Sequence, residues 1–381
     1  MDIKRKLTIE QKLYNRYNQR EWMKINSKIQ VQDDVKGVNK SMNVTTIFTI
    51  VLIAGICVAA VILAAARICF EIVFRVPKSE SLNLYRFPKS EQYSRYTDEM
   101  TALIKNAQAI PYEDVWIKSF DGLKLHGRFY YTAQNAPTQI MFHGYRSASV
   151  RDFCGGLKEG LEAGYNVLLV DQRAHGESEG KYLTFGILER RDCLAWTEYV
   201  CQKMGSDAKI LLYGISMGAA TVLMAAGLEL PSNVIGIVAD CGYTSPEAII
   251  KKVMHDRKYP VSVLYPLTRL GAKLYGGFDL EEISAPETLK RSSIPVFFVH
   301  GDDDRFVPWE MSRENYQASS AVIKRFLTIT EAGHGISYIV DRKKYLTELF
   351  EFLDDILRTE EREESKADQE SQACLDFVTK R

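Results

Sequence analysis

Short apolar runs alternate with amphipathic stretches along most of the chain. Between about residues 93 and 358, runs typical of buried strands are separated by segments with apolar residues at helical spacing. The runs are "TQIMFHGY", "NVLLVDQR", "KILLYGIS", "VIGIVADCG", "IPVFFVHGD" and "KRFLTIT", preceded by "VWIKSFDGLKLHGRFYY" with Asp121–Gly122 as a hairpin turn. This alternation predicts an α/β domain over residues 93–358, with a mostly parallel central sheet and helices on both faces.

Two stretches depart from this rhythm. Residues 243–291 hold no clear strand and several aromatic residues, which predicts a helical cap over the carboxyl edge of the sheet. A crossover helix with a long loop is the alternative. The last helix is expected over residues 336–358, and residues 359–381 are polar and charged, as is typical of a disordered tail.

A longer apolar run lies near the amino end. Residues 47–66, "IFTIVLIAGICVAAVILAAA", carry no charge over twenty positions, which is enough to cross a bilayer as a helix. We predict a retained transmembrane helix here, between a basic tail at 1–46 and a linker at 67–92. A cleaved signal peptide and a buried core helix are the alternatives. The forty-six preceding residues argue against the first, and the lack of a polar face argues against the second.

The side of the membrane is less clearly marked. The tail holds ten basic residues, Lys4, Arg5, Lys6, Lys12, Arg16, Arg20, Lys24, Lys28, Lys36 and Lys40. They favour a cytoplasmic tail and an outward-facing domain, although Arg67, Arg75, Lys78 and Arg86 nearly balance the count close to the membrane. Seven cysteines without the pattern of a disulfide framework suit a reducing compartment instead. We predict a single-pass membrane protein with the domain outward.

Composition narrows the class of protein. Hydrophobic residues make up 46% and charged residues 26% of the chain, which is ordinary for a folded protein. Lys plus Arg and Asp plus Glu both number 49. The balance gives no electrostatic footprint for a nucleic acid, so we expect no nucleic-acid partner.

One serine sits between two glycines at a strand-to-helix junction. Gly214–Ile215–Ser216–Met217–Gly218 matches G-x-S-x-G, in which the serine takes a strained turn and the glycines avoid collisions. Ser216 would project from the carboxyl edge of the sheet, beside the unpaired N–H groups of the following helix. The pentapeptide alone is only moderately specific, since a structural turn can use it too.

Acidic residues and a histidine follow the later strands. Three aspartates, 302–304, follow "VFFVH" after a single glycine, and His334 follows the next strand in "ITEAGHG". Serine, acid and histidine in this order match the chain order of a hydrolase triad. Asp302 follows a glycine and is expected to hold a turn, whereas Asp303 is expected to face solvent. Asp304 is then the acid that orients His334.

Five motifs in order carry a resemblance to a known family. "HGY" at 143–145, "DQRAHGES" at 171–178, "GISMG", "HGDDDRFVP" and "AGHG" resemble α/β-hydrolases of the serine-aminopeptidase-like and monoacylglycerol-lipase-like branch, over about residues 110–358. The resemblance implies the α/β-hydrolase fold. It also implies an oxyanion hole made by the backbone N–H groups of Tyr145 and Met217.

The remaining histidines have weaker claims. In the family that the chain resembles, the segment holding His175 buttresses the nucleophile turn, and its place in the chain order does not suit a triad. His143 and His300 each precede a glycine at a strand end, where a hydrogen-bonded structural role is expected. His126 lies in the hairpin and His255 in the presumed cap, so neither is well placed.

We expect no metal or cofactor. Consecutive aspartates rarely converge on one ion, and no EF-hand, HExxH or CxxC spacing accompanies them. Phosphate-binding glycine motifs are absent from the sequence as well.

The predicted activity is that of a membrane-anchored serine hydrolase. It would cleave an ester, thioester or amide of a small-molecule, acyl or peptide substrate through an acyl-enzyme, with the bilayer as partner of residues 47–66. A catalytically silent hydrolase-like scaffold is the rival from another class, since fold alone does not fix function. An acyltransferase or a peptidase would use the same triad.

Overall fold

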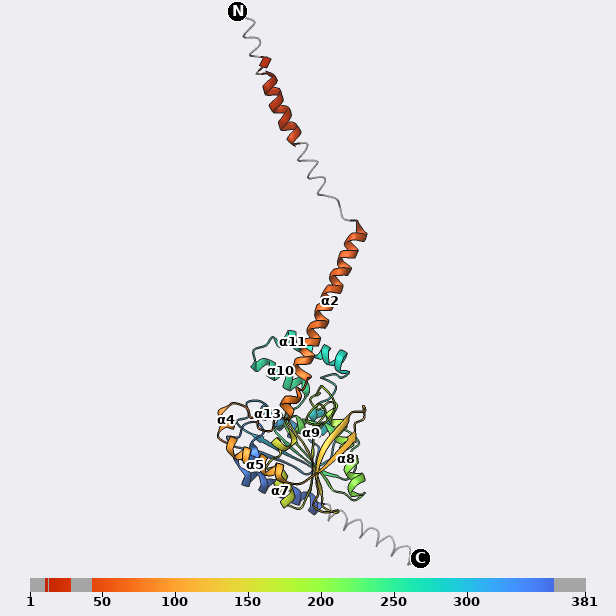
Figure 1. The fold of residues 1–381 in the computed structure, drawn as a ribbon, viewed down its shortest axis with the longest axis vertical. Helices are drawn as coiled ribbons and strands as arrows, with labels where there is room; N and C mark the ends of the chain where they lie inside the picture. The colour runs from red at the N-terminus through yellow and green to blue at the C-terminus, as the bar shows by residue number, and fades with distance from the viewer. Residues whose placement is uncertain (1–10, 13, 29–42, 360–381) are drawn as a thin grey trace, which may run out of the picture. The chain divides into compact units, whose positions relative to one another are not determined.

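The computed structural model describes residues 11–12, 14–28 and 43–359 (Figure 1). Residues 11–12 and 14–28 are helical. The chain divides into two units, Met1–Leu63 and Ala64–Arg381, and the second contains the whole sheet. Most of the basic tail predicted at 1–46 and nearly all of the polar tail predicted at 359–381 lie outside the described residues.

The predicted mostly parallel sheet is confirmed. Eight strands form it in the order β1-β2-β4-β3-β5-β6-β7-β8. They are β1 Glu113–Lys118, β2 Lys124–Tyr130, β3 Thr138–Phe142, β4 Asn166–Val170, β5 Ile210–Ile215, β6 Val234–Asp240, β7 Val296–Gly301 and β8 Lys324–Ile329. β2 pairs antiparallel with β1 and β4, and all other pairs are parallel. All strands except β2 therefore run in the same direction, and the carboxyl ends of these seven strands lie at one edge.

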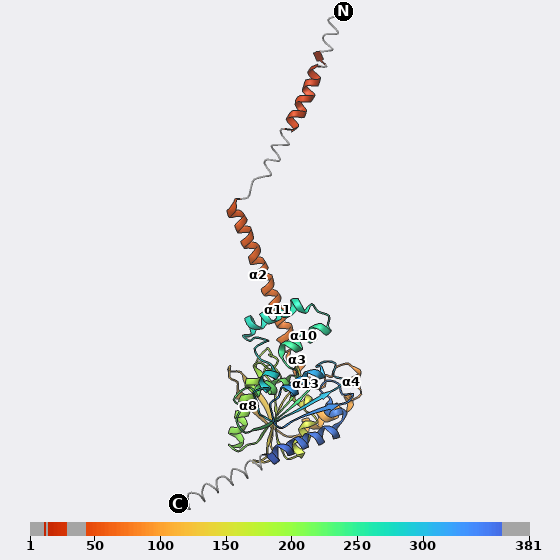
Figure 2. The same cartoon turned by 180° about the vertical axis from the view of Figure 1, so that it is seen from behind.

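Helices cover both faces of this sheet, as Figures 1 and 2 show from opposite sides. The helices that follow residue 43 in the described part of the chain, whether or not they lie on the sheet, are α2 Val44–Phe74, α3 Lys78–Ser81, α4 Glu91–Ser94, α5 Thr97–Ala109, α6 Ser149–Asp152, α7 Gly156–Glu162, α8 Glu189–Met204, α9 Met217–Ala225, α10 Pro246–Asp256, α11 Val261–Gly271, the π-helix η1 Ala272–Gly276, α12 Ala285–Leu289, α13 Trp309–Ala318, α14 Ser337–Val340 and a last helix at 342–359. Alternate strand residues face opposite ways. Ile140 and Phe142 of β3 join a core with α8 and α9, whereas Met141 joins a core with α5, α7 and the last helix.

The stretch predicted as a cap, residues 243–291, contains α10, α11, η1 and α12 and no strand. The helix predicted at 336–358 is broken at Asp341. There the backbone leaves the helical region (φ −142°, ψ 74°), and the Asp341 carboxylate accepts a hydrogen bond from the Lys344 N–H at 3.0 Å. Asp341 thus caps the start of the last helix, a role that its short acidic side chain favours.

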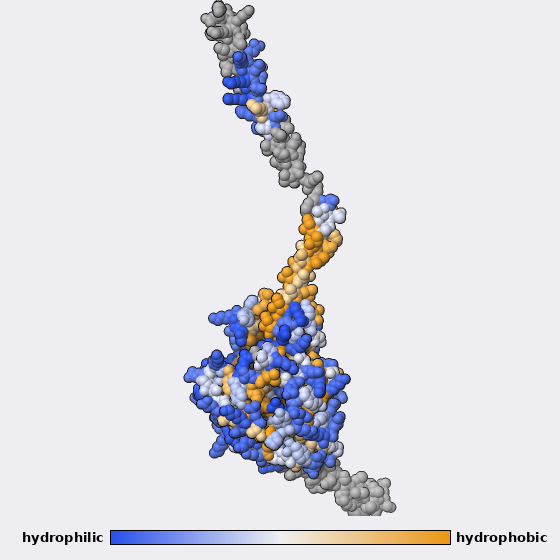
Figure 3. Space-filling view, in the orientation of Figure 1, coloured by the Kyte–Doolittle hydropathy of each residue, from blue (hydrophilic) through white to orange (hydrophobic). Residues whose placement is uncertain are grey.

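Helix α2 is longer than the apolar run that predicts it. It is long and apolar enough to cross a membrane by length and composition, and Figure 3 shows its hydrophobic surface. The hydropathy pattern ends the helix at residue 66, but the structure continues it by two turns through part of the predicted linker. Ala66, Phe70 and Phe74 are fully buried in these turns, because residues four apart lie on one helix face and this face packs on the domain.

Candidate active site

The predicted nucleophile lies on a sharp turn between β5 and α9. Ser216 has φ 56° and ψ −114°, a conformation that is rare for a residue with a side chain. A Cβ atom at Gly214 would lie 2.2 Å from the Gly218 oxygen, and one at Gly218 would lie 1.8 Å from the Phe142 oxygen. Only glycine fits at either position, so the spacing of the motif follows from the close approach of α9 to β3 and β5.

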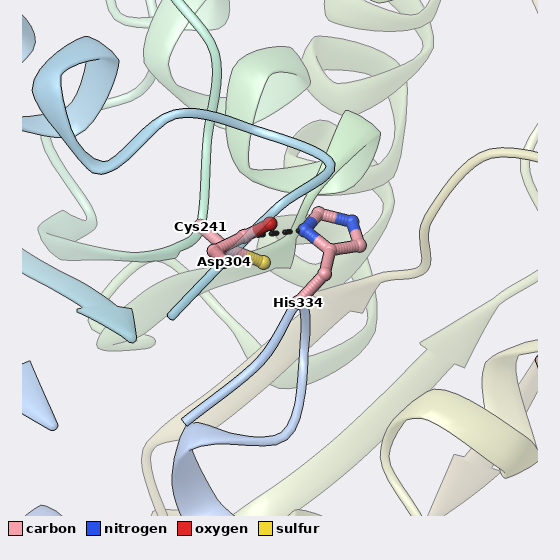
Figure 4. Close-up of side chains that lie close together, drawn as sticks. All are labelled: Cys241, Asp304 and His334. Atoms are coloured by element: carbon pink, nitrogen blue, oxygen red, sulfur yellow. Dashed lines mark hydrogen bonds and ion pairs between the residues drawn. The ribbon is translucent and has the colours of Figure 1, made fainter. Parts of the chain in front are cut away.

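Three predicted residues form one chain of hydrogen bonds. His334 Nε2 lies 2.8 Å from Ser216 Oγ, and His334 Nδ1 lies 2.7 Å from Asp304 Oδ2. Figure 4 shows the second of these bonds, with the ring and the carboxylate reaching toward each other from the loops that follow β8 and β7. Burial on its own would lower the pKa of His334, but the charge and hydrogen bond of Asp304 outweigh it and raise the pKa above 6.5.

Asp304 is held on all sides. Its side chain is fully buried, and Oδ1 accepts hydrogen bonds from the backbone N–H groups of Phe306 at 2.8 Å and Val307 at 2.9 Å. Burial favours the neutral acid, but the neighbouring rings of His334 and His300 together hold the pKa of Asp304 well below its usual range. Asp304 is therefore an anion beside the ring of His334.

The sequence did not connect His300 with Asp304. His300 Nε2 donates to Asp304 Oδ2 at 3.1 Å and to the Val307 oxygen at 2.9 Å, while Nδ1 contacts Ser312 Oγ at 2.6 Å. Its predicted hydrogen-bonded role is thus observed, with the acid itself as one partner. The four-residue distance from His300 to Asp304 around the end of β7 was the available signal.

The other two aspartates point elsewhere. Asp302 Oδ1 accepts a hydrogen bond from the Glu331 N–H at 2.7 Å, which ties the loop after β7 to the loop that carries His334. Asp303 is partly exposed and binds Gln92 Nε2 at 2.7 Å and Arg305 Nε at 3.0 Å. Of the three adjacent carboxylates, only that of Asp304 contacts His334.

The residues predicted to supply the oxyanion donors belong to segments that meet at Ser216. Met217 is the first residue of α9, and the first N–H groups of a helix have no partner within it. Tyr145 follows Gly144, where a Cβ atom would come within 3.4 Å of Ser216 Cβ. Gly144 N–H donates to Asp152 Oδ2 at 2.8 Å, so the loop after β3 is anchored beside the serine.

Of the other histidines given weaker claims, His126, His143 and His175 form hydrogen bonds that support the fold. His143 Nε2 accepts a hydrogen bond from the Gln172 N–H, and His175 Nε2 accepts one from the Arg146 N–H, both at 3.1 Å. His126 is buried between Asp114 and Asp171, 2.8 Å from each. His255 is 86% exposed at its side chain.

Gln92, the last residue of the predicted linker, and Tyr93, the first residue of the predicted domain, hold the loops that carry Asp304 and His334. The Tyr93 hydroxyl donates to the His334 carbonyl oxygen, and Gln92 Nε2 donates to the backbone oxygen of Asp303 at 2.7 Å. Neither residue belongs to a motif, and both precede the first strand. The sequence carried no signal that would have placed them at the site.

Cys241 lies beside Asp304 and His334, as Figure 4 shows. One possible ligand atom from each of the three lies within 4.8 Å of the others. A metal would need the thiolate, but burial and the charges of Asp240 and Asp304 raise the pKa of the Cys241 thiol well above its usual value. Asp304 and His334 are also hydrogen-bonded to each other at 2.7 Å, so the arrangement of these two side chains fits a proton relay better than a metal site.

Comparison with known proteins agrees with this architecture. A family described as the alpha/beta hydrolase fold matches residues 137–264. The uncharacterized protein YqkD of Bacillus subtilis is 30% identical over 198 residues, which are 51% of this chain and 64% of that protein. A thiohydrolase of Aspergillus aculeatus, AneE, is 31% identical over 32% of this chain and 40% of its own length. The chain thus spans less than two thirds of either relative.

Two further similarities are more extensive. The lysophosphatidylserine lipase ABHD12 of Rattus norvegicus is 24% identical over 72% of this chain and 66% of its own length. Among solved structures, an esterase of Pyrococcus furiosus matches with a TM-score of 0.54 and 25% identity, over 66% of this chain and 93% of that one. Sheet order, the turn after β5 and these similarities together establish that the chain has the α/β-hydrolase fold.

Proposed function

We propose that this chain is a membrane-anchored serine hydrolase that cleaves an acyl ester, thioester or amide through an acyl-enzyme. The observation that carries the proposal is the continuous chain of hydrogen bonds from Ser216 Oγ through His334 to Asp304, with distances of 2.8 and 2.7 Å. The esterase and the lipase among similar proteins favour an ester as substrate.

In the first half of the proposed reaction, Ser216 Oγ attacks the substrate carbonyl carbon while His334 Nε2 takes its proton. Asp304 keeps the Nδ1 proton of His334 in place and stabilises the imidazolium without taking the proton itself. The carbonyl oxygen becomes an oxyanion, which the N–H groups of Tyr145 and Met217 would stabilise. His334 then returns the proton to the leaving group, and the acyl group stays on Ser216.

In the second half, water replaces the leaving group. His334 Nε2 takes a proton from the water as it attacks the acyl carbon, and a second oxyanion forms in the same hole. Its collapse releases the acid and returns the proton to Ser216 Oγ. These steps need no metal or cofactor.

An apolar acyl group suits the surroundings of the serine. Ser216 is only 5% exposed, and the ring of Phe306 lies 5.0 Å from that of His334. Tyr145 stacks on Phe185 with ring centroids 5.3 Å apart. Mostly apolar linings with a few placed polar groups are typical of small-molecule sites. A panel of aryl esters of increasing acyl length and aminoacyl amides would define the substrate class.

A fluorophosphonate probe tests the nucleophile. It should label the wild type and fail on Ser216→Ala, and ester turnover should fall by several orders of magnitude, because members of a triad act as a unit. A folded wild type with neither labelling nor turnover would favour the silent scaffold. Labelling that persists in Ser216→Ala would place the nucleophile at another residue.

We also propose that α2 anchors the chain and that the hydrolase domain faces outward. The apolar composition of α2 supports the anchor, and the basic residues of the tail support the orientation. An impermeant protease added to intact cells should then remove the domain. Complete protection, with cleavage only after lysis, would reverse the orientation and agree with a reducing compartment.

A further inference from the structure

The loop that would supply one oxyanion donor also contacts the end of α2. The Tyr145 hydroxyl donates to the Val73 carbonyl oxygen at 3.1 Å. Arg146 Nη2 donates to the carbonyl oxygens of Ile72 at 2.9 Å and Arg75 at 2.6 Å. Tyr145 and Arg146 thus bind three backbone carbonyl groups among residues 72–75, at the end of α2 and just after it.

These carbonyls would otherwise lack partners. The last four carbonyls of a helix have no donor within it, and α2 ends at Phe74. The Phe74 oxygen accepts from the Leu183 N–H at 2.9 Å, and the Glu71 oxygen accepts from the Arg75 N–H at 3.3 Å. The remaining two, of Ile72 and Val73, are satisfied by Arg146 and Tyr145. A guanidinium group also suits the negative end of a helix.

The loop itself depends on outside supports. Arg146 has φ 48°, in the left-handed region that costs a residue with a side chain free energy. Its N–H is held by His175 Nε2, and the Tyr145 ring is held against Phe185. The turn keeps this conformation because partners fix both its backbone and its side chains, and the end of α2 is one of those partners.

We propose that Tyr145 and Arg146 are positioning residues, whose side chains use the end of α2 to fix the backbone N–H of Tyr145 for the oxyanion. This inference rests on the proposed serine hydrolase activity. Neither side chain is required to touch the substrate. Residues 72–75, which continue the candidate membrane helix into the domain, are thereby part of the structure that sets the rate.

The expected effect falls on the chemical step. Displacing a reacting group by about 1 Å can cost about 10² in rate, so losing both bonds of Arg146 in Arg146→Gln should lower kcat by about tenfold or more. Tyr145→Phe keeps the ring and the backbone N–H and loses only one hydroxyl, so a smaller loss of about threefold is expected. KM should change by less than about twofold in both, because binding of the acyl group is not altered.

Tyr182→Phe is the matched control. The Tyr182 hydroxyl also binds α2, donating to Glu71 Oε1 at 2.8 Å, but it lies outside the loop after β3. Full-length wild type and variants are compared in detergent for kcat, KM and thermal unfolding. Tyr182→Phe should match Tyr145→Phe in stability and keep the kcat of the wild type.

A sulfur-substituted substrate separates positioning from general damage. In a thionoester the developing charge lies on sulfur, a weak hydrogen-bond acceptor, so the oxyanion hole contributes less. The ratio of ester to thionoester turnover should therefore fall in Tyr145→Phe and Arg146→Gln and stay at the wild-type value in Tyr182→Phe. A merely structural defect lowers both rates equally and leaves the ratio unchanged.

Several outcomes would overturn the inference. An unchanged ratio in Tyr145→Phe, or an equal loss of kcat in Tyr182→Phe, would show that the contacts only stabilise the fold. Should Arg146→Gln not fold, Arg146→Lys, which keeps the charge with a different donor geometry, and Tyr145→Phe decide the question by the same ratio. Prolonged fluorophosphonate labelling reports on Ser216 separately. Its failure in the wild type would reject the proposed function, whereas full labelling with an unchanged ratio rejects only the positioning role.

Discussion

Replacing Asp304 with asparagine tests the proposed relay directly, because the two side chains have the same shape. The amide oxygen can keep the hydrogen bonds that Asp304 Oδ1 accepts from Phe306 and Val307. At the position of Oδ2, which accepts from His334 Nδ1, an NH₂ group would donate instead. We expect a folded variant in which His334 carries its proton on Nε2 and cannot take one from Ser216.

The size of the expected loss of turnover follows from the change of tautomer at His334. In a serine protease with a Ser-His-Asp triad, the same change of the aspartate lowers kcat by about 10⁴, which corresponds to about 5.5 kcal/mol of activation free energy. The fold should lose less, about 1–3 kcal/mol, because His300 Nε2 keeps its bond to the Val307 oxygen at 2.9 Å. The variant also removes the main cause that raises the pKa of His334. Residual activity should therefore persist to lower pH than in the wild type.

Ester turnover as a function of pH, together with thermal unfolding, checks both expectations. Asp303→Asn is the matched control and should change turnover by less than about tenfold, since its ion pair is exposed. Asp302→Ala should act through stability, at about 1–3 kcal/mol for the lost bond to Glu331. Near-normal turnover in a folded Asp304→Asn protein, with activity abolished by either neighbour's change, would show that the acid is misassigned.

Three further outcomes are expected. For the wild type, kcat/KM should fall as pH drops through the pKa of His334, with a midpoint above pH 6.5 because that pKa is raised. A midpoint below pH 6.5 in the pH profile of kcat/KM would contradict the proposed relay. Gly218→Ala should lower the free energy of unfolding in urea by more than about 4 kcal/mol, because the new Cβ would collide with the backbone of Phe142. Gly156→Ala is the control and should lower it much less, because its Cβ would have no neighbour closer than 3.8 Å. A fragment that begins at Lys78 lacks Phe70 and Phe74, so its free energy of unfolding in urea should be lower by roughly 5 kcal/mol or more than that of a fragment that begins at Ala64. Equal urea midpoints would show that the end of α2 is dispensable.

Much of the fold could be read from local patterns. Each of the eight strands coincides with an apolar run or an alternating stretch, because a strand buried on both faces needs apolar residues throughout. Asp121–Gly122 marks the β1–β2 hairpin, where Gly122 takes φ 92°. The break at Asp341 was missed because apolar spacing continues across it, and a single capping carboxylate ends one helix and begins the next.

The geometry of the candidate site was predictable where a short motif imposes a single geometric requirement. The turn at Ser216 was predicted from the two glycines that flank it. Asp304 was chosen among three adjacent aspartates because Asp302 was expected to hold a turn and Asp303 to face solvent. Contacts between segments far apart in sequence were not predictable. The hydrogen bonds from Tyr93 to the loop of His334 and from Arg146 to the end of α2 depend on tertiary placement, which neither composition nor periodicity records.

The end of α2 shows why a hydropathy threshold misplaces a boundary. Phe70 and Phe74 are as apolar as the exposed residues before them, so hydropathy cannot separate a helix face that meets a membrane from one that packs on protein. The structure does separate them, because Ala66, Phe70 and Phe74 lie on one helix face and all three are fully buried. The hydrolase unit begins at Ala64. The boundary between the proposed anchor and the α/β-hydrolase unit therefore falls inside one continuous helix, and the turns beyond it belong to the unit that holds the proposed oxyanion loop.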